Sequence, residues 1–174
     1  MSLLNQFKYV KCFAFDVDGV LTDGSLLLLD DGQMVRSMNT KDGYALQLAI
    51  KKGYHIIIIS GGVNAEGARL RLHKLGITEV HFGAGNKKDV LNIFLAANNI
   101  TAEEVLFMGD DIPDLPAMKA AGLPCCPADA VPEVKAISKY IASMPGGKGC
   151  VREVIEKVLK LQGQWANDVS IASK

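Results

Sequence analysis

The chain has 174 residues, of which 49% are hydrophobic and 22% charged, a balance typical of a globular domain and not of a disordered or fibrous chain. Nineteen basic and nineteen acidic residues cancel, so no overall field draws the protein to nucleic acid or to an anionic membrane. A single domain over residues 1–174 is expected from this length, and any bound anion must be held by a local site.

The four cysteines have neither the spacing of zinc ligands nor a C-x-x-C pair; they are Cys12, Cys125, Cys126 and Cys150. This pattern favours reduced thiols in a reducing compartment. The first residues do not resemble a signal peptide, and no apolar run approaches the roughly 18 residues of a spanning helix. We therefore expect a cytoplasmic protein that binds neither membranes nor nucleic acid.

Short apolar runs alternate with longer amphipathic stretches along the chain. The predicted strands are Tyr9–Phe15, His55–Ile59, Val80–Phe82, Val105–Met108 and Tyr140–Ala142. The predicted helices are Asp42–Lys52, Glu66–Leu75, Lys87–Ala97, Leu115–Ala121 and Cys150–Leu161. Strict alternation predicts an α/β fold, a Rossmann-like three-layer sandwich with a central parallel sheet and helices on both faces. Ligands of such a fold bind beyond the carboxyl ends of the strands.

One segment departs from the alternation directly after the first strand. Within Ser25–Met38, β-prone residues flank Asp31-Gly32, a sequence typical of a hairpin with a type I′ turn. We expect this β-hairpin, at about residues 24–38, to project from the sheet. Residues 162–174 lose the helical period and are predicted to form a loose tail.

Acidic residues follow two of the predicted strands. Asp16 and Asp18 come directly after the first strand, and Asp110, Asp111 and Asp114 follow Val-Leu-Phe-Met. Each set alone is consistent with solvated turn residues or helix caps. Together they place five carboxyl groups at one edge of a parallel sheet, and carboxylates about 4 Å apart repel by roughly 4 kcal/mol at an effective dielectric near 20. Oxygen ligands of this kind indicate a hard divalent cation, Mg²⁺ first.

Two further features lie where a phosphate would be held. Ser60 follows the Ile-rich strand and precedes Gly61-Gly62, so its hydroxyl and the nearby N–H groups can face an anion. Lys87 opens a helix after a glycine-containing loop and can reach the same edge as a point charge. Either residue alone is as consistent with a cap or a solvated side chain, but their positions at consecutive strand ends favour a phosphate site.

Four segments, DVDGVLTDG, IISGG, Lys87 and GDDIPD, resemble the four motifs of the haloacid dehalogenase superfamily of phosphatases. The match runs from about Phe7 to Leu161. The short length, a hairpin in place of a large cap, NTKDGYALQ and GGKGCVREV resemble its 3-deoxy-D-manno-octulosonate 8-phosphate (KDO 8-phosphate) phosphatase family. The resemblance implies Mg²⁺-dependent hydrolysis of KDO 8-phosphate to the free sugar acid and phosphate, in lipopolysaccharide precursor synthesis.

The resemblance also implies a role for each motif residue. Asp16 is implied to attack phosphorus and form an aspartyl-phosphate, with Asp18 as general acid and then general base. Mg²⁺ is implied to bind the Asp16 carboxylate, the Asp18 backbone carbonyl and Asp110. Ser60 and Lys87 are implied to hold the phosphoryl oxygens. Asp111 and Asp114 are implied to support the metal ligands.

Specificity is less well defined by the motifs. Many family members carry an arginine where this chain has Gly62, and a related branch acting on a nine-carbon sugar acid phosphate tends to carry glutamate there. Substrate contacts are expected from Gly61, Gly62, Arg69 and Arg152, although a solvated helix arginine is the plain alternative for Arg152. The resemblance implies a homotetramer whose neighbouring subunits complete each active site, with the apolar flank Leu26–Leu29 at an interface or packed on its own sheet.

Other functions remain open at this point. The chain is also consistent with a phosphatase for a nine-carbon keto-deoxy sugar acid 9-phosphate or for another small sugar phosphate. A non-catalytic tetramerising module would fit the fold but not the intact set of acids and lysine. A phosphorylated signalling receiver would take its phosphoryl aspartate from a central strand and would not place D-x-D on the first one.

Overall fold

The computed structural model describes residues 2–63 and 65–172. Six parallel strands form one sheet in the order β5-β4-β1-β6-β7-β8. The strands are β1 (Cys12–Phe15), β4 (His55–Ile59), β5 (Glu79–His81), β6 (Val105–Met108), β7 (Leu123–Cys126) and β8 (Tyr140–Ile141). The helices are α1 (Leu3–Tyr9), α2 (Thr40–Lys51), α3 (Glu66–Lys74), α4 (Lys87–Asn98), α5 (Leu115–Ala120), α6 (Pro132–Ile137) and α7 (Cys150–Leu161).

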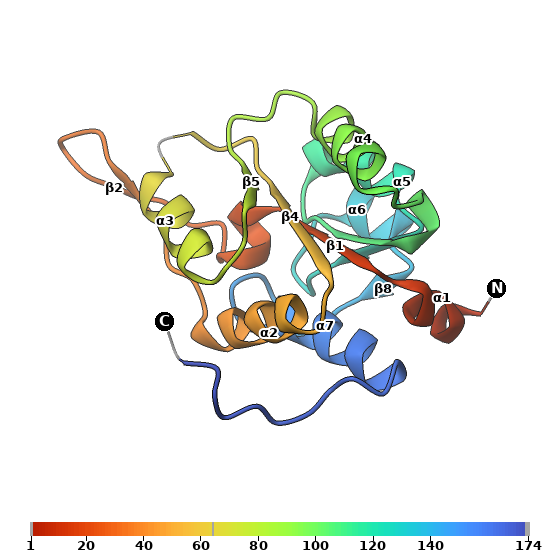
Figure 1. Ribbon diagram of the computed structural model, residues 1–174. Helices are drawn as coiled ribbons and strands as arrows, with labels where there is room; N and C mark the ends of the chain where they lie inside the picture. Colours follow the sequence, from red (N-terminus) through yellow and green to blue (C-terminus); the bar gives the residue numbers. More distant parts are fainter. Residues whose placement is uncertain (1, 64, 173–174) are drawn as a thin grey trace.

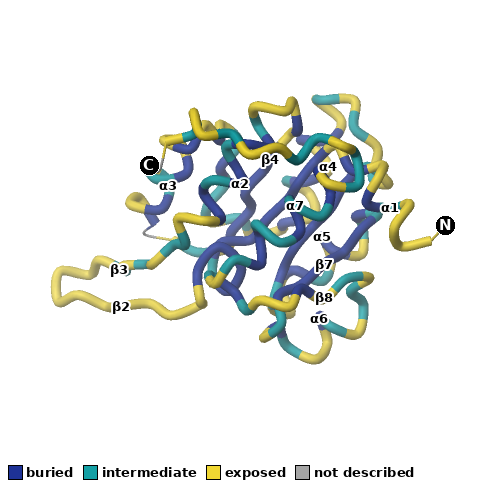
Figure 2. Tube along the Cα trace, turned by 90° about the horizontal axis from the view of Figure 1, so that it is seen from below, coloured by how far each residue is buried: buried dark blue, intermediate teal, exposed yellow. Residues whose placement is uncertain are grey.

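The sheet is the middle of three layers, which confirms the predicted α/β sandwich (Figure 1). Successive side chains of β1 point to opposite faces: Phe13 and Phe15 pack with α2 and α7, whereas Cys12 and Ala14 pack with α4 and α5. All four residues of β1 are fully buried, and Figure 2 shows the same burial along the central strands. A strand covered on both faces cannot alternate with polar residues, which explains the continuous apolar run in the sequence.

Two elements of the sheet region differ from the sequence prediction. Tyr9 ends the helix α1 instead of beginning the first strand. The strand β7 was not expected, because Pro124 cannot donate a ladder hydrogen bond and normally argues against a central strand. The carbonyl of Pro124 accepts from Lys139 N on the side of β8 at 2.8 Å, so the absent N–H lies on that side and the ladder to β6 is intact.

The hairpin projects from the body of the protein as β2 (Leu27–Leu28) paired with β3 (Met34–Val35) (Figures 1 and 2). The predicted type I′ turn is wrong. Leu29 and Gln33 close a three-residue loop, in which Gly32 N donates to Leu29 O at 2.9 Å. Gly32 has a φ of +85°, whereas Asp31 does not have a positive φ; a type I′ turn requires it at both central residues.

Residues 162–172 after α7 form no helix or strand, yet they are not the loose tail that the sequence suggested for residues 162–174, of which the last two lie outside the described chain. The segment runs along α2 (Figure 1), where Trp165 stacks edge-on against Tyr44 at 6.3 Å between ring centroids. Lys51 Nζ lies 2.6 Å from a carboxylate oxygen of Asp168. Aperiodic segments can be held by such contacts, which hydrophobic periodicity does not reveal. In residues 2–63 and 65–172, no helix has the length and apolar character to cross a membrane.

Candidate active site

The candidate site lies at the carboxyl ends of four neighbouring strands. Asp16 follows β1, Asp110 follows β6, Ser60 follows β4, and Lys87 opens α4 after β5. Because β5, β4, β1 and β6 are adjacent in the sheet, these residues come from one edge. Asp16 N donates to Met108 O at 3.1 Å, which ties the first acidic loop to the end of β6.

Three carboxylates form a compact acidic cluster at this edge. Oxygen atoms of Asp16, Asp110 and Asp114 lie within 4.8 Å of one another. Gly19 allows the close approach: a Cβ atom at this position would lie 2.0 Å from Asp110 Oδ2, and the residue has a φ of +90°. Any side chain at position 19 would therefore push Asp110 out of the cluster.

Lys87 is the cation that contacts this cluster. Its Nζ lies 2.6 Å from Asp114 Oδ1 and 2.9 Å from Asp16 Oδ1, and the side chain is nearly buried. Burial alone would lower the pKa of Lys87, but the Asp16 and Asp114 carboxylates raise it above its usual value. The lysine therefore remains a fixed positive charge at neutral pH.

One lysine does not balance three carboxylates. Burial, followed by the charge of Asp114, raises the pKa of Asp16 to about 7 against the opposing effect of Lys87. Burial, followed by Asp16, Asp114 and Asp111, raises the pKa of Asp110 to about 7. Asp110 Oδ1 is buried without a hydrogen-bond partner, whereas the buried Asp16 Oδ1 contacts the ammonium group of Lys87 at 2.9 Å. Carboxylate oxygens that lie this close together, with more negative charge than one lysine offsets, fit a hard divalent cation.

Asp114 and Asp111 mainly organise the loop after β6. Asp114 Oδ2 accepts hydrogen bonds from the N–H groups of Asp110 at 3.0 Å and Asp111 at 3.2 Å. Asp111 is exposed and caps the next turn, with its Oδ1 accepting from Ile112 N at 2.7 Å. Asp114 therefore fixes both Lys87 and the backbone that presents Asp110.

Asp18 has a partner that the sequence analysis missed. Arg36, directly after β3, donates from Nε to Asp18 Oδ1 at 2.8 Å and from Nη2 to Asp18 Oδ2 at 3.1 Å. The guanidinium also donates from Nη1 to Met34 O at 3.1 Å. The signal in the sequence is indirect: a hairpin that leaves the sheet just after Asp18 must bring its second strand back to the same edge.

Ser60 and its glycines line the other side of the site. Ser60 is buried, and its Oγ accepts from Gly62 N at 3.1 Å. A Cβ atom at Gly62 would lie 2.9 Å from Asp18 Oδ2 and 3.1 Å from Arg36 Nη2. A glycine at position 62 thus leaves room for the Asp18–Arg36 ion pair.

The two arginines selected from the sequence have partners elsewhere. Arg69 donates to Val80 O at 3.1 Å and lies over the ring of Phe82. Arg152 lies 5.5 Å from the ring centroids of both Tyr44 and Trp165. Neither contact includes a member of the acidic cluster.

The GGKG loop, residues 146–149, contacts the turn that follows β1 and carries Asp18. Gly147 N donates to Val20 O at 2.9 Å, and Asp42 Oδ1 accepts from Arg152 N at 2.7 Å. Burial raises the pKa of Asp42 to about 6, against the opposing effect of the Arg152 and Gly149 N–H groups. These contacts hold the first turn of α7 next to the turn that carries Asp18.

Comparison with known proteins gives one consistent family. Residues 64–153, just over half of the chain, match the model of haloacid dehalogenase-like hydrolases. The chain is 34% identical to the Escherichia coli (strain K12) 3-deoxy-D-manno-octulosonate 8-phosphate phosphatase KdsC over 155 residues, which covers 89% of this chain and 82% of that protein. The chain belongs to the KDO 8-phosphate phosphatase family of haloacid dehalogenase-like hydrolases.

Solved structures of this family superimpose closely. The Yersinia pestis KDO 8-phosphate phosphatase has a TM-score of 0.90 and 31% identity, covering 93% of this chain and 87% of that one. The Moraxella catarrhalis enzyme, determined with a magnesium ion, a phosphate ion and a KDO molecule, has a TM-score of 0.87 and 34% identity, covering 92% and 91%. The segment that matches the hydrolase model contains Lys87, Asp110 and Asp114.

Proposed function

We propose that this protein is a Mg²⁺-dependent phosphomonoesterase that hydrolyses KDO 8-phosphate to KDO and phosphate, a step in lipopolysaccharide precursor synthesis. The names of its relatives and the ligands of the Moraxella structure support the substrate and the metal. The observation that carries the chemistry is the compact cluster of Asp16, Asp110 and Asp114 carboxylates around one lysine, in which the buried Asp110 Oδ1 has no hydrogen-bond partner.

Asp16 is the proposed nucleophile. Its carboxylate attacks phosphorus, so that an Asp16 O–P bond forms while the bond from phosphorus to the sugar C8 oxygen breaks. Asp18 delivers a proton to the departing oxygen, which leaves as the neutral alcohol. Splitting the hydrolysis into two displacements gives each step a nucleophile or a base that is already in position.

The second step regenerates Asp16. Asp18, now without its proton, removes one from a water molecule that attacks the phosphorus of the aspartyl-phosphate, and inorganic phosphate leaves. Lys87 Nζ, held between Asp16 and Asp114, neutralises charge on the phosphoryl oxygens in both steps. We assign Ser60 and the N–H groups of Gly61 and Gly62 to the remaining phosphoryl oxygens.

Asp16, Asp110 and the Asp18 backbone carbonyl are the proposed Mg²⁺ ligands, with Asp111 and Asp114 in support. When bound, Mg²⁺ supplies two positive charges that offset the carboxylates and the incoming phosphate. Without such a cation, a phosphate dianion would enter a site in which the described acidic cluster already outweighs Lys87. The protein side chains provide the charge balance only in part.

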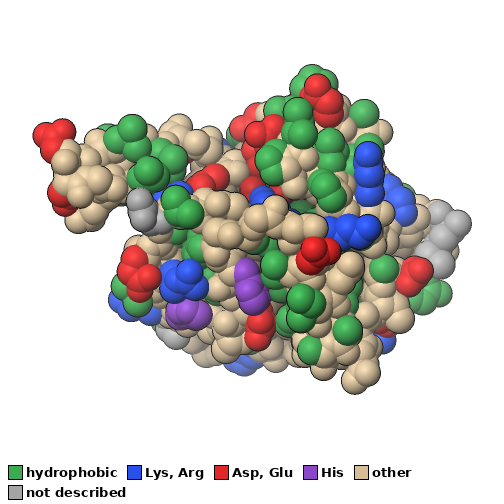
Figure 3. Space-filling model, turned by 90° about the horizontal axis from the view of Figure 1, so that it is seen from above, with side chains coloured by type: hydrophobic (Ala, Val, Ile, Leu, Met, Phe, Trp, Pro, Cys, Tyr) green, Lys and Arg blue, Asp and Glu red, His purple; other side chains and the backbone are tan. Residues whose placement is uncertain are grey.

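A homotetramer is the proposed assembly, with a neighbouring copy covering each site, and the cytoplasm is the proposed compartment. The side chains of Leu27 and Leu28 on the hairpin are 63% and 67% exposed, and Figure 3 shows hydrophobic side chains gathered along the projecting hairpin. Exposed apolar residues on a projecting element are typical of an interface. The exposure of Leu26–Leu29 supports an interface over packing of this flank on its own sheet, the alternative from the sequence.

A phosphate-release screen over phosphorylated sugar acids, including the eight- and nine-carbon compounds, tests this function in the presence of Mg²⁺. We expect a clear preference for KDO 8-phosphate. Asp16→Asn, which keeps the size of the side chain, should lose turnover by a factor of at least about 10⁴. Glu133→Gln removes an exposed carboxylate of α6 and should keep full activity.

Three results would contradict the proposal. Equal rates on unrelated monoesters would indicate a general phosphatase, and phosphate release by Asp16→Asn close to that of the wild type would exclude Asp16 as nucleophile. Absence of phosphate release from every compound would favour a non-catalytic module.

A further inference from the structure

Arg36 is the buried cation whose role the phosphatase mechanism leaves unexplained. Its side chain is only 4% exposed, whereas the Asp18 side chain that it binds is 27% exposed. Both Asp18 oxygens accept from the guanidinium, at 2.8 and 3.1 Å. With both oxygens turned to the guanidinium, Asp18 is held as an acceptor, whereas the proposed mechanism requires it to face and protonate the leaving oxygen, so the ion pair must open during turnover.

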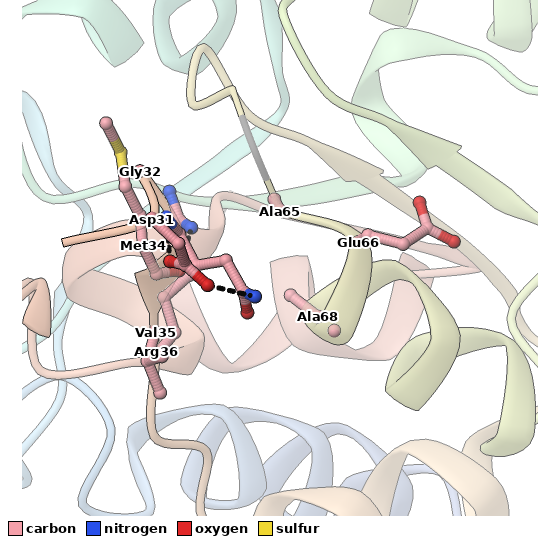
Figure 4. Close-up of a pocket in the computed structure, with 10 residues that line it drawn as sticks. Asp31, Gly32, Met34, Val35, Arg36, Ala65, Glu66 and Ala68 are labelled. Carbon is pink, nitrogen blue, oxygen red and sulfur yellow. Dashed lines mark hydrogen bonds between the residues drawn. The ribbon is translucent and has the colours of Figure 1, made fainter. Parts of the chain in front are cut away.

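A cavity lies beside this ion pair. It has a volume of about 640 Å³ and is lined by hairpin residues 31–36 and by residues 65–68 at the start of α3 (Figure 4). This volume is within the range of small-molecule sites. Arg36 therefore lies between the cavity, on one side, and Asp18 of the catalytic edge, on the other.

The acidic residues of this cavity have their own partners. Asp31 accepts hydrogen bonds from Gln33 N at 3.0 Å and from Gln33 Nε2 at 2.8 Å. Glu66 lies 3.7 Å from Arg69 Nε. Among the residues that line the cavity, all within the described chain, Arg36 is the only arginine or lysine.

The other arginines near the site are engaged away from the acidic cluster. Arg69 binds the carbonyl of Val80, and Arg152 stacks between aromatic rings and lies 3.3 Å from Glu156. Within residues 2–63 and 65–172, Arg36 is the arginine that forms an ion pair with a carboxylate of the catalytic edge. It is therefore the guanidinium best placed to meet an anionic part of the substrate.

We propose that Arg36 binds the carboxylate of the sugar acid, and that this carboxylate takes the place of Asp18 on the guanidinium as the substrate enters. The inference rests on the proposed function, because KDO 8-phosphate carries a carboxylate in addition to its phosphate. Exchange of one bidentate carboxylate for another keeps Arg36 paired throughout. The same exchange frees Asp18 to face the leaving oxygen.

This exchange would make the carboxylate a condition for fast turnover. A sugar phosphate that lacks a carboxylate must either leave Asp18 on Arg36 or leave the buried guanidinium without a carboxylate to offset its charge, and both are costly. Discrimination of this kind is strong because the site rejects analogues that leave its polar groups unpaired. Gly62 is part of the arrangement, since a side chain there would contact both Asp18 and Arg36.

Two substrates and three variants test the proposal. Phosphate release is measured for KDO 8-phosphate and for D-arabinose 5-phosphate, which has no carboxylate, with wild type, Arg36→Met, Arg36→Lys and the control Arg71→Met. Arg71 lines the neighbouring cavity with Arg36, whereas the ion pair of Asp18 is formed with Arg36. Thermal unfolding verifies that each variant is folded.

For Arg36→Met, kcat/KM on KDO 8-phosphate should fall roughly 10- to 100-fold, mainly through KM, as expected for loss of a bidentate charged contact. On D-arabinose 5-phosphate it should stay within about threefold of wild type or rise. Arg36→Lys should give an intermediate loss, because the charge remains without the planar fork. Arg71→Met should resemble the wild type on both substrates.

Binding of the product separates this inference from the proposed function. By calorimetry, Arg36→Met should bind free KDO about 10-fold or more weakly than the wild type and inorganic phosphate equally well. Equal losses on both substrates, or an unchanged Kd for KDO, would overturn the role of Arg36. Failure of the wild type to hydrolyse KDO 8-phosphate would instead overturn the proposed function, whatever the KDO affinity.

Discussion

Removal of the divalent cation should make the stability of this protein fall as the pH rises. The pKa values of Asp16 and Asp110 are each raised to about 7, above the ordinary value of 3.8, chiefly by burial. Between these values the folded protein holds protons that the unfolded chain has released. The free energy of unfolding therefore decreases from about pH 4 to pH 7 and levels off above it.

The size of the effect follows from the shifts. One pKa unit corresponds to about 1.4 kcal/mol. Between pH 5 and pH 7.5, loss of its proton by a fully desolvated carboxylate with such a shift lowers the free energy of unfolding by about 2 kcal/mol. The decrease is smaller for the partly exposed Asp110, so the two residues together lower the free energy of unfolding by on the order of 3 kcal/mol. Mg²⁺ replaces these protons, and it should stabilise the fold at pH 7.5 far more than at pH 5.

Urea unfolding in EDTA and in millimolar Mg²⁺, at both pH values, measures this coupling. Asp42→Asn is a useful background variant, because Asp42 also has a pKa raised by burial, to about 6, but lies outside the acidic cluster. Asp168, whose pKa is lowered to about 2 by Lys51 and Ser170, affects stability only at lower pH. A Mg²⁺ effect of equal size at pH 5 and pH 7.5 would refute the reasoning.

Two further predictions follow from the site and the hairpin. Lys87→Met removes the ammonium group between Asp16 and Asp114 and should lower kcat in the phosphate-release assay by about 100-fold or more; a kcat within threefold of wild type would contradict its role. The double variant Leu27→Glu and Leu28→Glu places charge on the exposed hairpin flank and should lower the mass in light scattering, since it should dissociate the proposed tetramer; an unchanged mass would exclude this flank as an interface.

The catalytic edge was predictable because its signal is local. An apolar strand buried on both faces must be a continuous apolar run, and the first polar residues after it mark the end of the strand. Asp16 and Asp110 follow such runs directly, and parallel pairing of β1 with β6 brings the two ends together. The same logic placed Ser60 and Lys87 at neighbouring strand ends.

Features that depend on distant contacts were not predictable from local pattern. The strand β7 contains Pro124, and its position between β6 and β8 is decided by tertiary pairing. The pairing of Arg36 with Asp18 spans 18 residues of sequence and depends on the path of the hairpin. The segment that carries Trp165 has no period, and its packing against Tyr44 appears only once α2 and α7 are adjacent.

The most direct test of the account is to trap the phosphorylated enzyme. The protein is mixed with KDO 8-phosphate and Mg²⁺, quenched rapidly and treated with borohydride, which reduces a phosphorylated aspartate to homoserine, and its peptides are identified by mass spectrometry. We predict homoserine at position 16, and none there when substrate is omitted. Homoserine at Asp110 or Asp18, or an unmodified Asp16 during steady turnover, would contradict the central claim that Asp16 carries the phosphoryl group.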